Sequence, residues 1–118
     1  MRIKMGANAL KRKRKTMKAA KGYFGAKSRQ YRAAKQQVMR SGNYAYVGRK
    51  LEKRTMRQLW IARINAACRQ NDISYSVFMH GLRLANITLN RKVLAEIAVS
   101  DEAAFKGLVV SANKAIAK

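Results

Sequence analysis

The stretch KRKRKTMKAAKGYFGAKSRQYRAAK, residues 11–35, decides how this chain is organised. It contains eleven Lys or Arg residues but no Asp, Glu or Pro. The residues around it favour helix, so the sequence predicts a long basic helix over residues 9–40, with bends marked by Gly22 and Gly25. Its apolar stripe is thin, and like charges four residues apart repel each other. We therefore expect this helix to form fully only when its charges meet an anionic partner.

The positive charge of the chain is concentrated in its N-terminal part. The 118 residues include 27 Lys or Arg and 5 Asp or Glu, which gives a net charge of +22. Residues 1–70 carry 21 of the basic residues and only one acid, Glu52, whereas residues 71–118 are nearly neutral. So large a charge is offset by a polyanion in normal use, and a basic arm before a neutral body is typical of nucleic-acid-binding proteins. The 48% hydrophobic content argues against complete disorder.

The segment RSGNYAYVGRK, residues 40–50, is rich in turn and hinge residues and predicts a break after the first helix. A second basic helix is expected from about Arg49 to Arg69. Its apolar face widens toward the C-terminal end, where Ile64 and Cys68 fall on one side. Because Cys68 shares a face with Ile64, the sequence predicts that it is a small core residue. Because it is the only cysteine, no disulfide is expected.

Three short helical segments follow, each with a start signal. The first is YSVFMHGLRL, with Ser74 or Ser76 as its N-cap. The second is RKVLAEIAV, preceded by Asn90, and the third is EAAFKGLVVSANKAIA, preceded by Ser100 or Asp101. The sequence thus predicts an all-α protein, with a long basic helical extension over residues 1–57 and a small compact helical domain over residues 58–118.

The sequence lacks the residue clusters that catalysis or metal binding needs. It has one His, one Cys and five scattered acids, without a metal-ligand motif or a phosphate-binding glycine loop. A pair of Cys68 and His80 is disfavoured, because no carboxylate stands near His80 in the sequence to orient it. We therefore expect no enzyme activity, no cofactor and no metal.

Membrane and targeting signals are also weak. No stretch has the length and apolarity of a membrane span, and no apolar signal-peptide core follows Met1. The basic N-terminus has the composition of a mitochondrial transit peptide, but its acid-free zone continues to Leu51, past the usual length of such peptides. A membrane-surface peptide is disfavoured because the C-terminal half is nearly neutral and carries a core of its own.

Aromatic residues are interleaved with the basic residues of the arm, which suggests binding to a nucleic acid. Lys and Arg neutralise phosphates, and aromatic rings such as Tyr23 and Phe24 can stack on exposed bases. The alternative is that these rings pack on the protein itself. A long basic arm on a small body suits a folded RNA better than a DNA duplex. A nucleoid-type basic DNA-binding protein remains the second candidate.

Four stretches, AKGYFGAKS, LWIARINAACRQ, SYSVFMHGL and LNRKVLAEIAVSD, are specific enough to compare with a known family. Together they resemble the bacterial large-subunit ribosomal protein twenty family over nearly the whole chain. The resemblance implies a structural constituent of the large subunit that binds large-subunit ribosomal RNA beside neighbouring ribosomal proteins. It also implies early action in subunit assembly, a monomer within the cytoplasmic bacterial ribosome rather than an organellar one and, in some members, repression of the protein's own messenger RNA.

The resemblance and the charge pattern together predict the RNA-contacting residues. One segment departs from the family: YVGRKLEKRTMRQ, residues 46–58, is less rich in Arg and contains Gly48, Glu52 and Met56, which implies fewer contacts there. The lead-in MRIKMGANAL is also atypical. The predicted contact residues are Arg2, Lys4, Lys11, Arg12, Lys13, Arg14, Lys15, Lys18, Lys21, Tyr23, Phe24, Lys27, Arg29, Arg32, Lys35, Arg40, Arg49, Lys50, Lys53, Arg54, Arg57, Arg63, Asn65, Arg69, Tyr75, Ser76 and His80.

Overall fold

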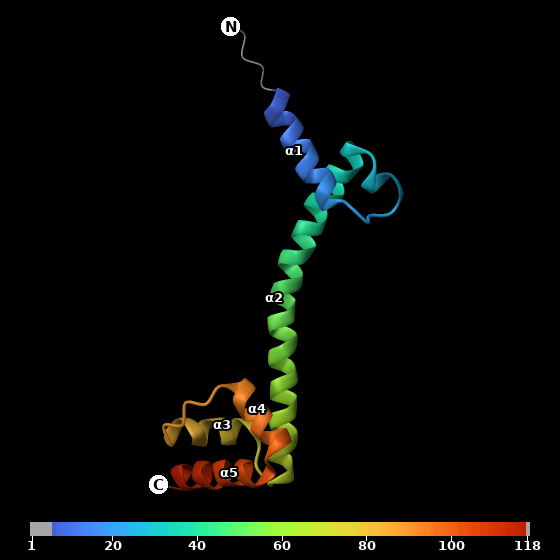
Figure 1. Cartoon of the computed structure of the whole chain (residues 1–118). Coiled ribbons are helices and arrows are strands. Elements are labelled where there is room, and N and C mark those ends of the chain that lie inside the picture. The colour runs from blue at the N-terminus through green and yellow to red at the C-terminus, as the bar shows by residue number, and fades with distance from the viewer. Residues whose placement is uncertain (1–5, 118) are drawn as a thin grey trace. The chain divides into compact units, whose positions relative to one another are not determined.

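The computed structural model describes residues 6–117. Within this range the chain forms five α-helices and one short 3-10 helix and contains no strand, so the prediction of an all-α fold is confirmed (Figure 1). In chain order the elements are α1 (Gly6–Ala19), η1 (Gly25–Ser28), α2 (Tyr31–Gln70), α3 (Tyr75–Leu84), α4 (Arg91–Ser100) and α5 (Glu102–Ile116).

The chain divides into an N-terminal unit, Met1–Leu51, and a C-terminal unit, Glu52–Lys118. Helix α2 contributes its first half to the N-terminal unit and its second half to the C-terminal unit. The boundary of an independently folding domain at residues 57 and 58 stays a prediction from the sequence.

The first basic helix is interrupted rather than bent. α1 ends at Ala19, and α2 begins at Tyr31, so residues 20–30 leave the helical path that the sequence predicted over residues 9–40. Gly22 and Gly25 have φ angles of +84° and +60°, in the left-handed region that glycine adopts without steric cost. Because a right-handed α-helix requires a negative φ, two such residues end the helix completely.

The break predicted over residues 40–50 is wrong, because α2 runs through it without interruption. Both glycines of the segment, Gly42 and Gly48, lie within the helix and keep negative φ angles. A glycine inside a helix costs only about 1 kcal/mol relative to Ala, and the segment contains no proline. Ending and restarting a helix would leave several backbone groups without partners, so continuation is cheaper.

The helix starts predicted in the C-terminal unit are confirmed in detail. Ser74 caps α3 by accepting from the amide of Val77, and Asn90 caps α4 by accepting from the amide of Val93 at 2.9 Å. Asp101 caps α5 in the same way, accepting from the amide of Ala104 at 2.9 Å. The alternatives Ser76 and Ser100 are not the caps.

Helices α2 and α3 end in the same capping motif. After α2, Asp72 takes a φ of 55° and the amide of Ile73 donates to the carbonyl of Cys68 at 3.1 Å. After α3, Asn86 also has a φ of 55°, and the amide of Ile87 donates to the carbonyl of Leu82 at 2.9 Å. This six-to-one bond across a left-handed residue is the Schellman motif, which reverses the chain after each helix.

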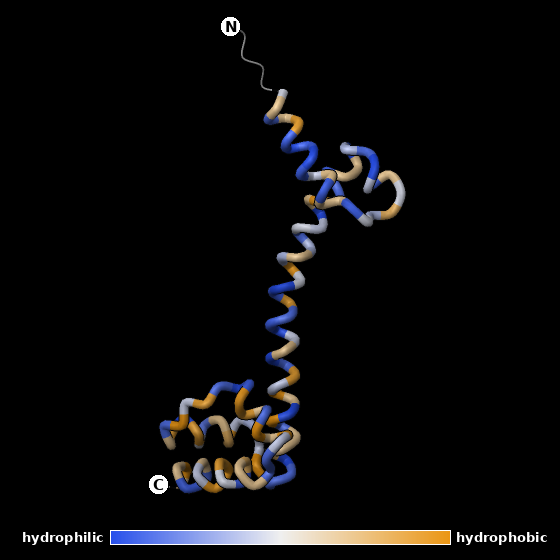
Figure 2. Tube along the Cα trace, viewed as in Figure 1, coloured by the Kyte–Doolittle hydropathy of each residue, from blue (hydrophilic) through white to orange (hydrophobic). Residues whose placement is uncertain are grey.

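The C-terminal unit contains the main core. Residues of α2, α3, α4 and α5 meet there, and the rings of Phe78 and Phe105 lie 5.1 Å apart. Gly81 on α3 packs so closely on α5 that an added Cβ would lie 2.7 Å from the backbone oxygen of Ala112. Hydrophobic segments are frequent in this unit in Figure 2, whereas hydrophilic ones dominate α1. The fully buried core side chains include Ile64, Cys68, Phe78, Leu94 and Phe105.

The prediction that Cys68 is a core residue is confirmed. Its side chain has no exposed surface, and burial raises the pKa of the thiol to about 11. The thiol therefore stays protonated at neutral pH and has little reactivity as a nucleophile.

Candidate nucleic-acid interface

Helix α1 presents cations in every direction. Residues 11–15 are five consecutive Lys or Arg, and successive residues of an α-helix are rotated by about 100° around its axis. The side chains therefore encircle the helix, and all five are exposed. No residue of α1 is fully buried. The N-terminal unit contains no Asp or Glu that could pair with these cations. The helix is suited to lie among phosphates on several sides rather than on one flat surface.

The segment between α1 and α2 is tied to α2 by side chains. The hydroxyl of Tyr23 donates to Oγ of Ser41 at 3.0 Å, which joins this segment to the third turn of α2. Ala20, directly after α1, and Ala34, near the start of α2, are both fully buried. These interactions fix where the connecting segment lies within the N-terminal unit.

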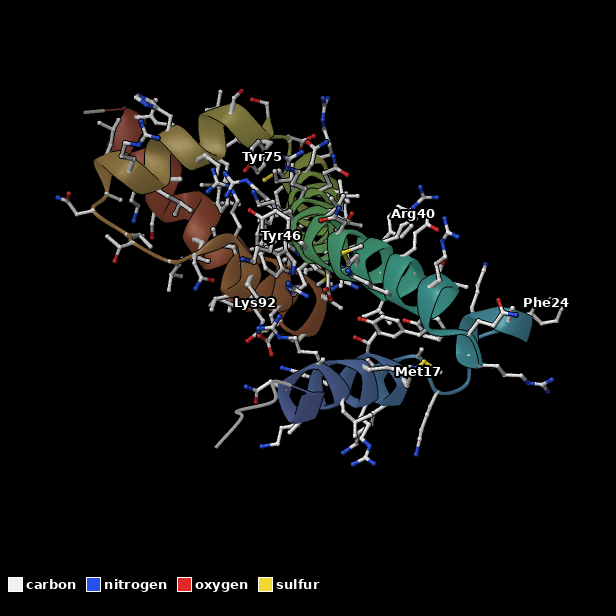
Figure 3. The ribbon with its side chains drawn as sticks, turned by 90° about the horizontal axis from the view of Figure 1, so that it is seen from above. Met17, Phe24, Arg40, Tyr46, Tyr75 and Lys92 are labelled. Atoms are coloured by element: carbon white, nitrogen blue, oxygen red, sulfur yellow. The ribbon has the colours of Figure 1, made fainter. Side chains whose placement is uncertain are left out.

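Tyr23 and Phe24, for which the sequence predicted the same role, have different environments. Tyr23 is half-buried and hydrogen-bonded, as its packing alternative predicted. Phe24 is 92% exposed, and Figure 3 shows its side chain extending away from the ribbon. Of the two rings, only Phe24 is fully available for stacking on a base.

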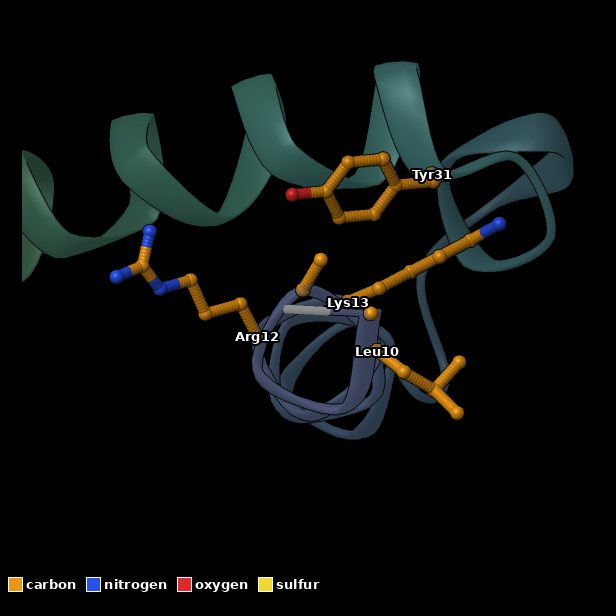
Figure 4. A pocket seen from close by; sticks show the side chains of 6 residues that line it. Leu10, Arg12, Lys13 and Tyr31 are labelled. Atoms are coloured by element: carbon orange, nitrogen blue, oxygen red, sulfur yellow. The ribbon is translucent and has the colours of Figure 1, made fainter. Parts of the chain in front are cut away.

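An open pocket of about 490 Å³ lies between α1 and the start of α2 (Figure 4). The ring of Tyr31 covers one side of it, and Nζ of Lys13 lies 5.8 Å from the centre of that ring. A similar pair lies farther along α2, where Nζ of Lys50 is 4.5 Å from the ring of Tyr46. Such cation–π contacts hold the ammonium groups near aromatic faces without neutralising them. The pocket could not be predicted from the sequence, because it depends on the interruption of the first helix.

In the C-terminal unit, Tyr75 has a different role from its predicted neighbours. Its hydroxyl accepts a hydrogen bond from Nε of Arg91 at 2.9 Å, and its ring packs against the core. Ser76 and His80 on the same helix are exposed, as are the predicted contacts on the end of α2. Tyr75 thus positions Arg91, a cation that sequence reasoning missed because 16 residues separate the two side chains.

A groove of about 390 Å³ between α2 and α4 is the other feature that sequence reasoning missed. Trp60 and Val99 supply apolar surface, Arg63 and Lys92 supply positive charge, and Glu96 supplies one negative charge. Only Arg63 belonged to the predicted contacts. No pattern within either helix indicates the groove, since it forms where two helices distant in sequence pack together.

All but two of the predicted contact residues in the described range are exposed to solvent. Every predicted Lys and Arg from Lys11 to Arg69 is exposed, and so are Phe24, Asn65, Ser76 and His80, while Tyr23 and Tyr75 are half-buried. Arg2 and Lys4 lie outside the described residues. Figure 3 shows one of these cations, Arg40, extending away from α2. Within residues 6–117 the ion pair is Glu102 with Lys106, at 2.8 Å, so the predicted cations are not used up by internal carboxylates.

Comparison with known proteins shows the family to which the chain belongs. The family model described as ribosomal protein L20 matches residues 2–108, which includes most of both units. The chain belongs to the ribosomal protein L20 family. It is 58% identical over 118 residues to large ribosomal subunit protein bL20 of Kosmotoga olearia, with all of both chains covered. It is 60% identical over 116 residues to the protein of that name from Agathobacter rectalis, with 98% of each chain covered.

As a member of the L20 ribosomal protein family, the chain is a structural protein and not an enzyme. Among the residues that the structure describes, no group of three His, Cys, Asp or Glu side chains could hold a metal ion. No helix over the described range is long and apolar enough to cross a membrane.

Proposed function

We propose that the chain is a structural constituent of the large ribosomal subunit that binds large-subunit ribosomal RNA and supports early subunit assembly. The observation that carries the proposal is the N-terminal unit, in which exposed cations surround a helix and no acid is present. The name shared by the L20 relatives, large ribosomal subunit protein, supports ribosomal RNA as the polyanion. The relatives are bacterial, which supports a cytoplasmic bacterial ribosome.

The two units divide the work of binding in this proposal. Residues 1–51 contain 16 Lys or Arg and no acid, whereas residues 52–118 contain 11 basic and 5 acidic residues. Each neutralised phosphate contributes about 0.7 to 0.9 to the slope of log affinity against log salt. The N-terminal unit should therefore supply most of the salt-dependent affinity. The C-terminal unit presents polar groups such as Asn65 and His80, which suit recognition of one RNA shape.

A salt series tests this division. The whole chain and a fragment of residues 58–118 are each titrated against large-subunit ribosomal RNA and against a scrambled RNA of equal length. The fragment is expected to prefer the ribosomal RNA while binding more weakly and with a shallower salt slope. If the fragment folds, as judged by circular dichroism, but shows no preference, recognition lies in the N-terminal unit and the proposed division is wrong.

The sequence analysis raised two other functions, DNA binding and repression of the chain's own messenger RNA. The comparisons do not support a nucleoid-type DNA-binding protein, because the chain matches an L20 ribosomal family instead. Repression of the chain's own messenger RNA stays a prediction. Adding the purified chain to a translation reaction programmed with that messenger should lower its output if the prediction holds.

A further inference from the structure

Phe24 has the most exposed large apolar side chain in residues 6–117. It is 92% exposed, compared with 70% for Val99 and 67% for Tyr44. A single exposed apolar residue is ordinary on a protein surface and carries no meaning by itself. Phe24 differs because the backbone on both sides of it is held in one conformation.

That conformation is built from local contacts within residues 20–30. Gly22 and Gly25 flank the Tyr23–Phe24 pair with left-handed φ angles, so the chain turns immediately before and after the ring. The amides of Arg29 and Gln30 both donate to the carbonyl of Ala26, at 3.1 and 2.8 Å, which closes the turn after the ring. Oγ of Ser28 donates to the carbonyl of Gly25 at 3.0 Å. The hydrogen bond from Tyr23 to Ser41 then joins the whole turn to α2.

The charges around the ring determine which partner it suits. Lys21, Lys27 and Arg29 come from the same turn and are exposed, and the N-terminal unit contains no acid. A second copy of this chain would bring the same uncompensated positive charge, so self-association through Phe24 is opposed by repulsion. A partner that combines a flat apolar face with negative charge at short spacing is an RNA strand, with its bases and phosphates.

We infer that Phe24 stacks on an unpaired base of the bound RNA, while Lys21, Lys27 and Arg29 hold the phosphates beside it. Tyr23 is a positioning residue, because its ring is half-buried and its hydroxyl keeps the turn on α2. The inference rests on the proposed function and deepens it by assigning to one side chain a base contact rather than a phosphate contact.

Variants at position 24 test the stacking. Truncating a ring that stacks on a base lowers affinity by about five- to a hundredfold, so Phe24→Ala of the whole chain should lose that much for large-subunit ribosomal RNA. Phe24→Trp keeps a stacking face and should bind like the unaltered chain, whereas Phe24→Leu keeps apolar volume without the face and should resemble Phe24→Ala. Met39→Ala is the matched control, because Met39 is also an exposed apolar residue of the N-terminal unit, at 60%.

Salt dependence separates a base contact from a phosphate contact. Phe24→Ala removes no charge, so its affinity should fall at every salt concentration with an unchanged slope. Lys27→Ala should instead lower the slope by about 0.7 to 0.9. Chemical probing of the RNA in the complex should show one or two nucleotides that become reactive with Phe24→Ala but stay protected with Met39→Ala.

The positioning role of Tyr23 has its own readout. Tyr23→Phe and Ser41→Ala each remove the same hydrogen bond, so the double variant should lose no more affinity than either single one. The nucleotides that they expose should be those exposed by Phe24→Ala. If Phe24→Ala binds within twofold of the unaltered chain and leaves the probing pattern unchanged, the stacking inference is wrong while the proposed function stands. If the unaltered chain fails to select ribosomal RNA, both fail.

Discussion

Replacing Gly81 with Ala should destabilise the C-terminal unit, although Ala is the better helix former. Gly81 lies in the middle of α3, where Ala is favoured over Gly by about 1 kcal/mol. The new Cβ would, however, lie 2.7 Å from both Cβ and the backbone oxygen of Ala112, and 2.9 Å from its carbonyl carbon. Contacts this short force α3 and α5 apart, because two of the three atoms belong to the backbone and cannot rotate away.

The size of the effect follows from these two opposing contributions. Overpacking a close contact costs about 1 to 3 kcal/mol, and rigid backbone neighbours place Gly81 at the upper end of that range. After subtracting the gain in helix propensity, the free energy of unfolding should fall by about 1 to 2 kcal/mol. For a unit of this size, that corresponds to a decrease of roughly 5 to 15 °C in Tm.

Gly107→Ala is the matched control. Gly107 lies in α5, and an added Cβ there would meet nothing within 4 Å, so only the gain in helix propensity remains. Its Tm should rise by roughly 4 to 8 °C. The assay is thermal and urea unfolding of the whole chain, followed by fluorescence of Trp60, which is the only Trp and packs on the core. If both variants shift the Tm in the same direction by similar amounts, the contact between α3 and α5 is not as close as described.

Two further predictions concern single residues of α2. Because burial raises the pKa of Cys68 to about 11, its thiol should resist alkylation at pH 8 in the folded chain and react quickly in urea. The folded state also binds the thiol proton more tightly than the unfolded state does. The free energy of unfolding should therefore fall as the pH rises from about 9 toward 11. Gly42→Ala and Gly48→Ala should both raise the helical circular-dichroism signal, because neither glycine has a positive φ and neither Cβ would meet an obstacle, whereas Gly22→Ala should not raise it, because its φ is +84°.

Features that depend on short-range interactions could be predicted from the sequence. The caps Ser74, Asn90 and Asp101 each bond to an amide three residues later, so the same few letters contain both the donor and the acceptor. The burial of Cys68 also followed from its position on the apolar face of a helix. These predictions needed only the helical period and the hydrogen-bonding capacity of one side chain.

Features that depend on the competition between alternatives were predicted poorly. Gly22 and Gly48 are the same residue type in similarly basic surroundings, yet one ends a helix and the other continues it. The difference lies in distant contacts such as the bond from Tyr23 to Ser41, which favours the turn in one place only. The groove beside Trp60 and the pairing of Tyr75 with Arg91 were missed for the same reason, since each joins residues of different helices.

The separation of charge from core explains how one short chain can serve as both a folded protein and a polyanion ligand. A buried charge is costly, and a dense cluster of like charges opposes compaction. Here no polar or charged residue in the described range is buried, and most of the net charge belongs to the unit with the fewest buried residues. Cations can therefore be added to or removed from α1 with little effect on the core around Phe78 and Phe105. Changes in that core should lower the amount of folded protein, whereas changes in α1 should lower its affinity for RNA.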